Sequence, residues 1–192
     1  MYFHSNFTLM RSDTPSIPAM PELVPILTRD EIDSKVARVA GRISSDYANS
    51  RLILVGVLKG AFVYLSDLIR HLKIPVQIDF VRAASYGVET ASSGRVCLSK
   101  EPEIDPAGRD VLIVEDIIDS GLTLAYLIEY FKARGAGSVK TSAFIDKRER
   151  REISVPVDYA CHVVQEGFLV GYGLDYAENY RELPGLYHLK FD

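Results

Sequence analysis

From Thr28 onward, apolar residues at helical spacing alternate with short continuous apolar runs. Thr28 and Glu31 have the spacing of a capping box, in which each side chain satisfies a free backbone N–H of the other residue, so a helix begins there. The apolar stripe of this helix consists of Ile32, Val36, Val39, Ile43 and Tyr47. The run 52–58, LILVGVL, is typical of a strand that is covered on both faces. A helix at 62–72 and a strand at 76–80 are predicted next.

The second half of the chain repeats this alternation around one charged segment. Residues 111–124, VLIVEDIIDSGLTL, place an apolar strand before two adjacent carboxylates and a turn of small and hydroxyl-bearing residues. An amphipathic helix follows and ends at Gly135, and further strands are predicted at 139–145 and 157–164. Strands that alternate with helices predict an α/β domain with a mainly parallel sheet flanked by helices.

Three segments depart from this pattern. Residues 1–27 contain four prolines without periodicity, which predicts an extended, partly disordered N-terminal arm before a single domain at 28–192. Residues 84–108 are small and polar, and we expect a long flexible loop with a short strand near 96–98. The last segment, from Gly167, is rich in Gly and Tyr and is expected to be irregular.

Composition narrows the class of protein. A 192-residue chain with 47% hydrophobic residues suits one globular domain with a substantial core. The net charge of −4 disfavours a nucleic-acid partner. No apolar run approaches the roughly 18–20 residues that span a bilayer, and the first residues lack a signal-peptide pattern. Cys97 and Cys161 lie in apolar contexts without metal-ligand spacing, which indicates buried thiols. We therefore expect a cytoplasmic protein with no membrane partner.

Charged residues directly follow three of the predicted strands. These residues are Lys59, the pair Glu115 and Asp116, and Lys147. Ligands of open α/β sheets bind at the carboxyl ends of the strands, so we expect a binding site at this edge. The rest of the charged run 147–152, KRERRE, is expected to be a solvated surface.

The turn at 119–123 has the composition of a phosphate-binding loop. Gly121 removes a Cβ, Ser120 and Thr123 add hydroxyl donors, and the following helix presents free N–H groups to an anion. A plain helix start, with Asp119 or Ser120 as the N-cap, is the alternative. That alternative leaves the two preceding carboxylates as uncompensated charges at the end of a buried strand. Two adjacent carboxylates suit a sugar diol, or a magnesium ion shared with one.

The segment 111–124 resembles the phosphoribosyl diphosphate (PRPP) binding motif of the type I phosphoribosyltransferases, and more narrowly of the hypoxanthine-guanine phosphoribosyltransferases. Four further segments match this family in chain order from about Thr28 onward: VGVLKGAFVYLSDL (55–68), the Ser85-Tyr86-Gly87 loop, FIDKRE (144–149) and GFLVGYGLDYAENYRELPGLY (167–187). The resemblance implies a type I phosphoribosyltransferase-like core with a small C-terminal, base-binding hood near 165–192. It also implies Mg²⁺-dependent transfer of phosphoribose from PRPP to hypoxanthine or guanine, and a homodimer or homotetramer.

The resemblance implies a role for each matching residue at the sugar and phosphate. Glu115 and Asp116 hold the ribose hydroxyls and help to hold magnesium, for which Asp175 is the direct ligand. The 5′-phosphate lies in the loop formed by Asp119, Ser120, Gly121, Leu122 and Thr123. Asp119 is implied to accept the proton of purine N7. Leu122 stands where some relatives carry a lysine, which removes one possible charge contact.

The remaining roles that the resemblance implies concern the diphosphate, the base and loop closure. Lys59, Gly60 and Arg181 bind the diphosphate, and the Leu58–Lys59 peptide is often cis in the family. Lys147 bonds the O6 atom of a 6-oxopurine, Phe168 stacks on the base, and the Leu169 backbone bonds its Watson–Crick edge. The loop that contains Ser85 and Tyr86 closes over the site.

Two other kinds of function remain open. A regulatory relative keeps the PRPP-binding fold but binds RNA or DNA and senses nucleotides, although such proteins usually show a basic face. The second is a phosphoribosyltransferase that prefers xanthine or adenine. Of these two bases, Lys147 favours the 6-oxopurine xanthine over adenine. Dinucleotide binding is disfavoured because Gly171-Tyr172-Gly173 lacks the third glycine of the motif.

Overall fold

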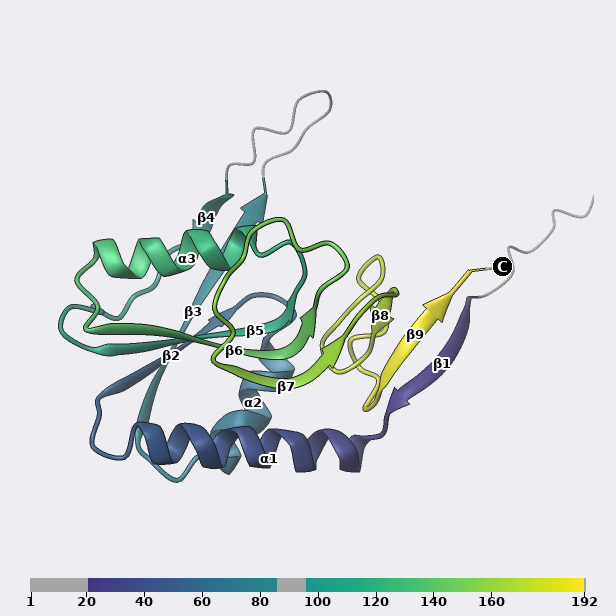
Figure 1. Cartoon of the computed structure of the whole chain (residues 1–192), viewed down its shortest axis with the longest axis horizontal. Helices are drawn as coiled ribbons and strands as arrows, with labels where there is room; N and C mark the ends of the chain where they lie inside the picture. Colours follow the sequence, from purple (N-terminus) through teal and green to yellow (C-terminus); the bar gives the residue numbers. More distant parts are fainter. Residues whose placement is uncertain (1–20, 86–95, 192) are drawn as a thin grey trace, which may run out of the picture.

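The computed structural model describes residues 21–85 and 96–191, which form a six-stranded sheet flanked by helices and a separate three-stranded sheet (Figure 1). The elements in chain order are β1 (Glu22–Leu27), α1 (Arg29–Asp46), β2 (Leu52–Val57), α2 (Phe62–His71), β3 (Val76–Ser85), β4 (Val96–Lys100), β5 (Asp110–Ile118), α3 (Leu122–Ala133), β6 (Ser138–Lys147), β7 (Tyr159–Val164), β8 (Leu169–Val170) and β9 (Leu186–Lys190).

The large sheet has the strand order β4-β3-β2-β5-β6-β7. The five strands in the order β3-β2-β5-β6-β7 pair with one another in parallel. Only the edge strand β4 pairs antiparallel, with β3. The predicted α/β class with a mainly parallel sheet is therefore confirmed. None of the described helices is long and apolar enough to cross a membrane.

The helices divide the core into two layers. α1 and α2 cover one face of the sheet, and α3 covers the other (Figure 1). All six residues of β2 are buried, and alternate residues serve opposite layers: Leu52 and Leu54 join the layer of α1 and α2, whereas Ile53 and Val55 join that of α3. This explains why β2 is a continuous apolar run without alternation.

The capping box predicted at the start of α1 is confirmed. The Thr28 backbone N–H donates to Glu31 Oε2 over 2.8 Å, and the Glu31 N–H donates to Thr28 Oγ1 over 3.3 Å. The predicted apolar stripe of this helix is buried in the core. Local sequence therefore determines where this helix begins and which face it buries.

The three-stranded sheet, in the order β1-β9-β8, forms the hood and lies at the end of the large sheet toward which β7 points (Figure 1). The expectation that order begins only at Thr28 is wrong for residues 22–27, which pair antiparallel with β9. The expectation of an irregular segment from Gly167 onward is wrong for β8 and β9. Pro25 is tolerated because β1 is an edge strand, where a missing N–H donor costs little.

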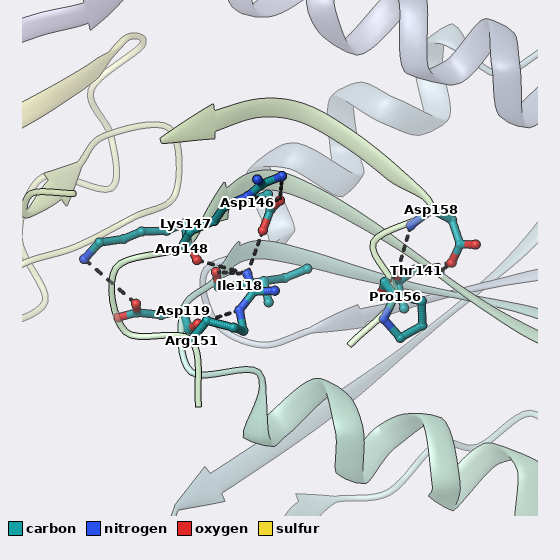
Figure 2. Close-up of polar contacts among 9 residues, drawn as sticks. All are labelled: Ile118, Asp119, Thr141, Asp146, Lys147, Arg148, Arg151, Pro156 and Asp158. Atoms are coloured by element: carbon teal, nitrogen blue, oxygen red, sulfur yellow. Dashed lines mark hydrogen bonds and ion pairs between the residues drawn. The ribbon is translucent and has the colours of Figure 1, made fainter. Parts of the chain in front are cut away.

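The boundaries of two predicted strands, β5 and β7, differ from the prediction. β5 continues through its carboxylates to Ile118, because residues up to Ile118 still pair with β6. β7 begins at Tyr159, since the Asp158 carboxylate accepts the Thr141 N–H over 2.9 Å ahead of the ladder (Figure 2). Within the segment 84–108, β4 confirms the short predicted strand, and 86–95 lie outside the described residues.

Candidate active site

The loop after β2 lies against the carboxylate of Asp116, on the neighbouring strand β5. The Leu58–Lys59 peptide in this loop is cis. A Cβ atom on Gly60 would lie 1.5 Å from Asp116 Oδ2, so only glycine allows this approach. Gly173 has a φ of 98°, and a Cβ atom there would lie 2.4 Å from the Gly60 carbonyl oxygen. Three segments that are distant in the sequence therefore meet closely at Gly60.

Two cationic side chains meet here, Lys59 of this loop and Arg181 of the hood, and both contact carboxylates of the hood. Lys59 Nζ lies 2.8 Å from Glu178 Oε2. Arg181 lies 2.7 Å from Asp175 Oδ1 and 3.5 Å from the same Glu178 oxygen, and it donates to the Gly173 carbonyl. The structure thus brings the predicted diphosphate residues together, with Glu178 bridging their side chains.

The adjacent carboxyl groups of β5 lie in an environment that favours their neutral forms. Glu115 is 7% exposed, and burial, followed by the charge of Asp116, raises the pKa of Glu115 well above its usual range. Burial raises the pKa of Asp116 to about 6, although the nearby Arg181 opposes this shift. The pair therefore retains a proton more readily than exposed carboxyl groups do.

The carboxylates predicted to hold magnesium do not form a closed metal site. Within residues 21–85 and 96–191, no group of three or more His, Cys, Asp or Glu side chains is arranged to hold a metal ion. Asp175 is close enough to Asp116 for its charge to raise the pKa of Asp116. Magnesium is often bound by one or two carboxylates together with substrate phosphates and water. These oxygen donors fit a magnesium ion that arrives with a polyphosphate.

The turn between β5 and α3 surrounds a small cavity of about 130 Å³, lined by Glu115, Ile117, Ile118, Asp119, Ser120, Gly121, Thr123 and Leu124. Gly121 is the N-cap residue of α3, with a φ of 85° and no side-chain cap bond. The N-cap position therefore belongs to Gly121 rather than to Asp119 or Ser120, although the Ser120 hydroxyl accepts the Leu122 N–H over 3.3 Å. In the first turn of α3, the N–H groups of Thr123 and Leu124 remain available beside the cavity, as a phosphate site requires.

Asp119 and Lys147 come from neighbouring strand ends and point toward one another (Figure 2). Lys147 is 6% exposed, and its Nζ lies 3.9 Å from Asp119 Oδ1 and 3.2 Å from Glu149 Oε2. Asp119 Oδ1 is buried and has no hydrogen-bond partner. A buried acceptor beside a buried ammonium group suits a ligand that carries a donor and an acceptor on one edge.

The predicted base-stacking residue belongs to an exposed aromatic cluster on the hood. Phe168 is 42% exposed, and its ring lies edge-on to Tyr176 at 5.4 Å and to Phe191 at 6.3 Å between centroids. The Gly167 N–H donates to Glu149, which also contacts the ammonium of Lys147. The hood turn that presents Phe168 and the strand end that presents Lys147 are therefore linked through Glu149.

Of three further predicted residues, the structure describes two. Leu169 is buried in β8, where it pairs with β9. Ser85 ends β3, and Tyr86 lies outside the described residues. Their roles at the base and in loop closure stay predictions.

Three charged side chains of the site were not predicted from the sequence: Glu149, Arg151 and Glu178. The charged run 147–152 reads as a solvated surface, yet the Arg151 side chain is only 18% exposed. Nothing in the local pattern distinguishes Arg151 from Arg148, which is 60% exposed. Spacing does not identify such residues, because their partners lie on other elements.

Sequence comparison shows which family the chain is similar to. A family model described as a phosphoribosyl transferase domain matches residues 26–177. The hypoxanthine-guanine phosphoribosyltransferase of Bacillus subtilis is 43% identical over 165 residues, which cover 86% of this chain and 92% of that protein. The hypoxanthine-guanine phosphoribosyltransferase of Dictyostelium discoideum is 44% identical over 169 residues, which cover 86% and 94%.

Solved structures show the same similarity. A hypoxanthine-guanine phosphoribosyltransferase from Bacillus anthracis superposes with a TM-score of 0.80 at 37% identity, covering 86% of this chain and 95% of that chain. A hypoxanthine phosphoribosyltransferase from Trypanosoma cruzi, solved as a ternary substrates complex, superposes with a TM-score of 0.83 at 37% identity, covering 89% and 96%. The similarity therefore extends over most of this chain and nearly the whole of each solved chain.

Proposed function

Because this chain belongs to the phosphoribosyltransferase family, and within it to the hypoxanthine-guanine phosphoribosyltransferases, we propose that it transfers the 5-phosphoribosyl group of PRPP to hypoxanthine or guanine. The products are IMP or GMP and diphosphate, and the pathway served is purine salvage. The observation that carries this proposal is the Asp119–Lys147 pair beside a phosphate-binding turn.

The base fits this pair because N7 and O6 lie side by side on one edge of a 6-oxopurine. The Lys147 ammonium group donates to O6, and the unpartnered Asp119 Oδ1 accepts the proton of N7. N9 forms the new bond to the anomeric carbon as the bond from that carbon to the diphosphate oxygen breaks. The N7 proton moves to Asp119, which also stabilises positive charge on the base. Adenine presents an amino group in place of O6 and would meet Lys147 donor to donor.

The sugar and the leaving group occupy the other half of the site. Glu115 and Asp116 hold the ribose hydroxyls, and the turn at 119–123 binds the 5′-phosphate. Lys59 and Arg181 receive the diphosphate as its charge develops. Asp175, Glu115 and Asp116 would hold magnesium together with substrate oxygens, and the ion would supply positive charge beside the diphosphate.

The direct test is a transfer assay with PRPP, with and without Mg²⁺, against hypoxanthine, guanine, xanthine and adenine. We expect turnover with hypoxanthine or guanine, little with adenine, and loss of turnover when Mg²⁺ is chelated. Turnover with xanthine alone would identify the xanthine-preferring alternative. Absence of turnover with every purine would favour the nucleotide-sensing regulatory alternative.

Removing the bridge between the two diphosphate-binding cations is expected to tighten diphosphate binding. Glu178→Gln frees Lys59 and Arg181 from a carboxylate that the incoming diphosphate must displace. Because exposed ion pairs contribute roughly 0–1 kcal/mol, the dissociation constant for diphosphate should fall about two- to fivefold. Titration calorimetry measures this change.

The matched control for this variant is Glu182→Gln, which removes the same charge from an exposed residue nearby in the chain. We expect Glu182→Gln to leave diphosphate binding close to that of the wild type. Equal tightening in both variants would show that the effect is one of net charge rather than of the bridge.

The stability of the unliganded protein is expected to fall as the pH rises from about 4 through 6 because of the β5 carboxyl pair. The folded chain raises the pKa values of Glu115 and Asp116, the latter to about 6, so it binds these protons more tightly than the unfolded chain does. The folded state is therefore favoured at low pH, and this contribution is lost as the pH passes through the raised values. Urea unfolding at pH 4–8 measures it.

Asp116→Asn should flatten this pH dependence, because it removes one titrating group and the charge that acts on Glu115. Glu166→Gln, which changes an exposed carboxylate, serves as the control and should keep the wild-type slope. A slope that is identical in the wild type and Asp116→Asn would contradict the assignment.

Three expectations remain predictions of this proposal. The chain is expected to assemble as a homodimer or homotetramer, to act in the cytoplasm, and to have no nucleic-acid partner. The resemblance to the family implies the first, and the net charge of −4 favours the last.

A further inference from the structure

Arg151 lies at the junction of the two strand ends that carry the base-contacting pair (Figure 2). Its Nε donates to the Asp119 carbonyl over 2.9 Å. One terminal nitrogen reaches three further acceptors: the Ile118 carbonyl at 3.1 Å, the Lys147 carbonyl at 2.9 Å and Asp146 Oδ1 at 2.6 Å. A single guanidinium group therefore contacts the ends of both β5 and β6.

These contacts begin where the strand ladder stops. Ile118 and Asp146 are the last residues that β5 and β6 pair with each other, whereas Lys147 still pairs with Val164 of β7. Asp119 lies beyond the last pair of β5, so the sheet does not set its position relative to Lys147. The buried Asp146 carboxylate compensates the charge of Arg151. The guanidinium group can therefore donate to main-chain carbonyls although it is largely buried.

The chain after Arg151 also lies over the phosphate-binding turn. The Glu152 and Ile153 N–H groups both donate to the Ser120 carbonyl, over 3.0 and 3.1 Å. A Cβ atom on Gly121 would lie 2.6 Å from the Ile153 carbonyl oxygen. The segment that carries Arg151 is thus attached to the turn at a second point, through main-chain bonds that do not depend on the Arg151 side chain.

We propose that Arg151 is a positioning residue that sets the Asp119 carboxylate at the correct place relative to the Lys147 ammonium group. The inference rests on the proposed function, because a 6-oxopurine presents N7 and O6 at a separation that the two side chains must match. The unpartnered Asp119 Oδ1 is not anchored by a hydrogen bond of its own. The position of this carboxylate is therefore set by its main chain, whose carbonyl Arg151 holds.

The size of the expected effect follows from geometry. A displacement of about 1 Å between catalytic groups can cost roughly 100-fold in rate. Lysine at this position keeps the charge but cannot donate from two nitrogens that are fixed in one plane. Arg151→Lys and Arg151→Ala should therefore both lower kcat/KM for hypoxanthine by roughly 100-fold, while the dissociation constant of Mg²⁺–PRPP stays close to that of the wild type.

Arg148 provides a matched control on the same carboxylate. Its side chain contacts Asp146 Oδ2 at 3.4 Å, yet it is 60% exposed. The hydrogen bonds of its side chain go to that carboxylate rather than to a strand-end carbonyl. Arg148→Ala removes a positive charge from the same place in the chain and should leave kcat/KM for hypoxanthine nearly unchanged.

The experiment measures steady-state kinetics for hypoxanthine and calorimetric binding of Mg²⁺–PRPP in the wild type, Arg151→Lys, Arg151→Ala and Arg148→Ala. Turnover of Arg151→Ala should recover when millimolar methylguanidine is added, a rescue that general destabilisation would not show. If Arg151→Ala does not fold, Arg151→Lys carries the kinetic comparison.

The outcomes separate the two proposals. An active wild type with Arg151 variants equal to Arg148→Ala overturns the positioning role and leaves the proposed function standing. Equal losses in hypoxanthine turnover and in PRPP binding also overturn it, because they indicate a structural role for the whole turn. A wild type that is inactive with every purine overturns both.

Discussion

Asp119→Asn is expected to lower kcat with hypoxanthine by about 10²- to 10⁴-fold, the usual contribution of a general base. The substitution keeps the size of the side chain but replaces a carboxylate that can take the N7 proton with an amide that cannot. Asp119 Oδ1 has no hydrogen-bond partner to lose, and Arg151 bonds the main chain rather than the carboxylate. The phosphate-binding turn should therefore keep its shape, and PRPP should still bind.

Rapid-quench single turnover with hypoxanthine measures the chemical step in this variant, and calorimetry measures PRPP binding. Glu149→Gln is the informative companion, because Glu149 is the other carboxylate beside the Lys147 ammonium group. It should cost far less in kcat, since it is not placed to accept the N7 proton. Normal turnover in Asp119→Asn would remove Asp119 from the chemistry.

Lys147→Met is expected to lower kcat/KM for hypoxanthine by roughly 10- to 100-fold, the cost of one lost hydrogen bond from a charged donor. Methionine keeps much of the buried side-chain volume, so the change tests the ammonium group rather than the packing. The loss should be largely in KM for the base, because Lys147 contacts O6 and not the sugar or the phosphates.

The measurement compares KM for hypoxanthine with KM for PRPP in Lys147→Met and in the smaller Lys147→Ala. Both variants should raise KM for the base far more than KM for PRPP. The preference for hypoxanthine over adenine should also decrease, since the donor that disfavours the adenine amino group is gone. An equal rise in both KM values would contradict the assignment to O6.

Helices, strands and the order of motifs were predictable because they depend on residues close together in the chain. The capping box at Thr28 sets the start of α1 through two bonds that span three residues. The apolar run of β2 predicts a strand covered on both faces, which the two core layers confirm. The motif at 111–124 likewise carries its carboxylates and its phosphate turn within one continuous segment.

The hood was not predictable in the same way, because its sheet joins opposite ends of the chain. β1 pairs with β9 across more than a hundred residues, and nothing in a proline-bearing segment identifies its partner. The need for glycine at position 60 was equally unpredictable. The Asp116 carboxylate lies where a Cβ atom would be, and that carboxylate comes from another strand.

The sequence by itself thus determined the family, the α/β alternation and the chemical types of the site residues, since local spacing encodes each of these. Only the tertiary structure decided which of several residues with the same charge takes part in the site. Arg148 and Arg151 stand in one charged run, yet one is exposed and the other bonds both strand ends. The physical reason is that a charge takes its role from its partners and its burial, and both are set by elements far away in the chain.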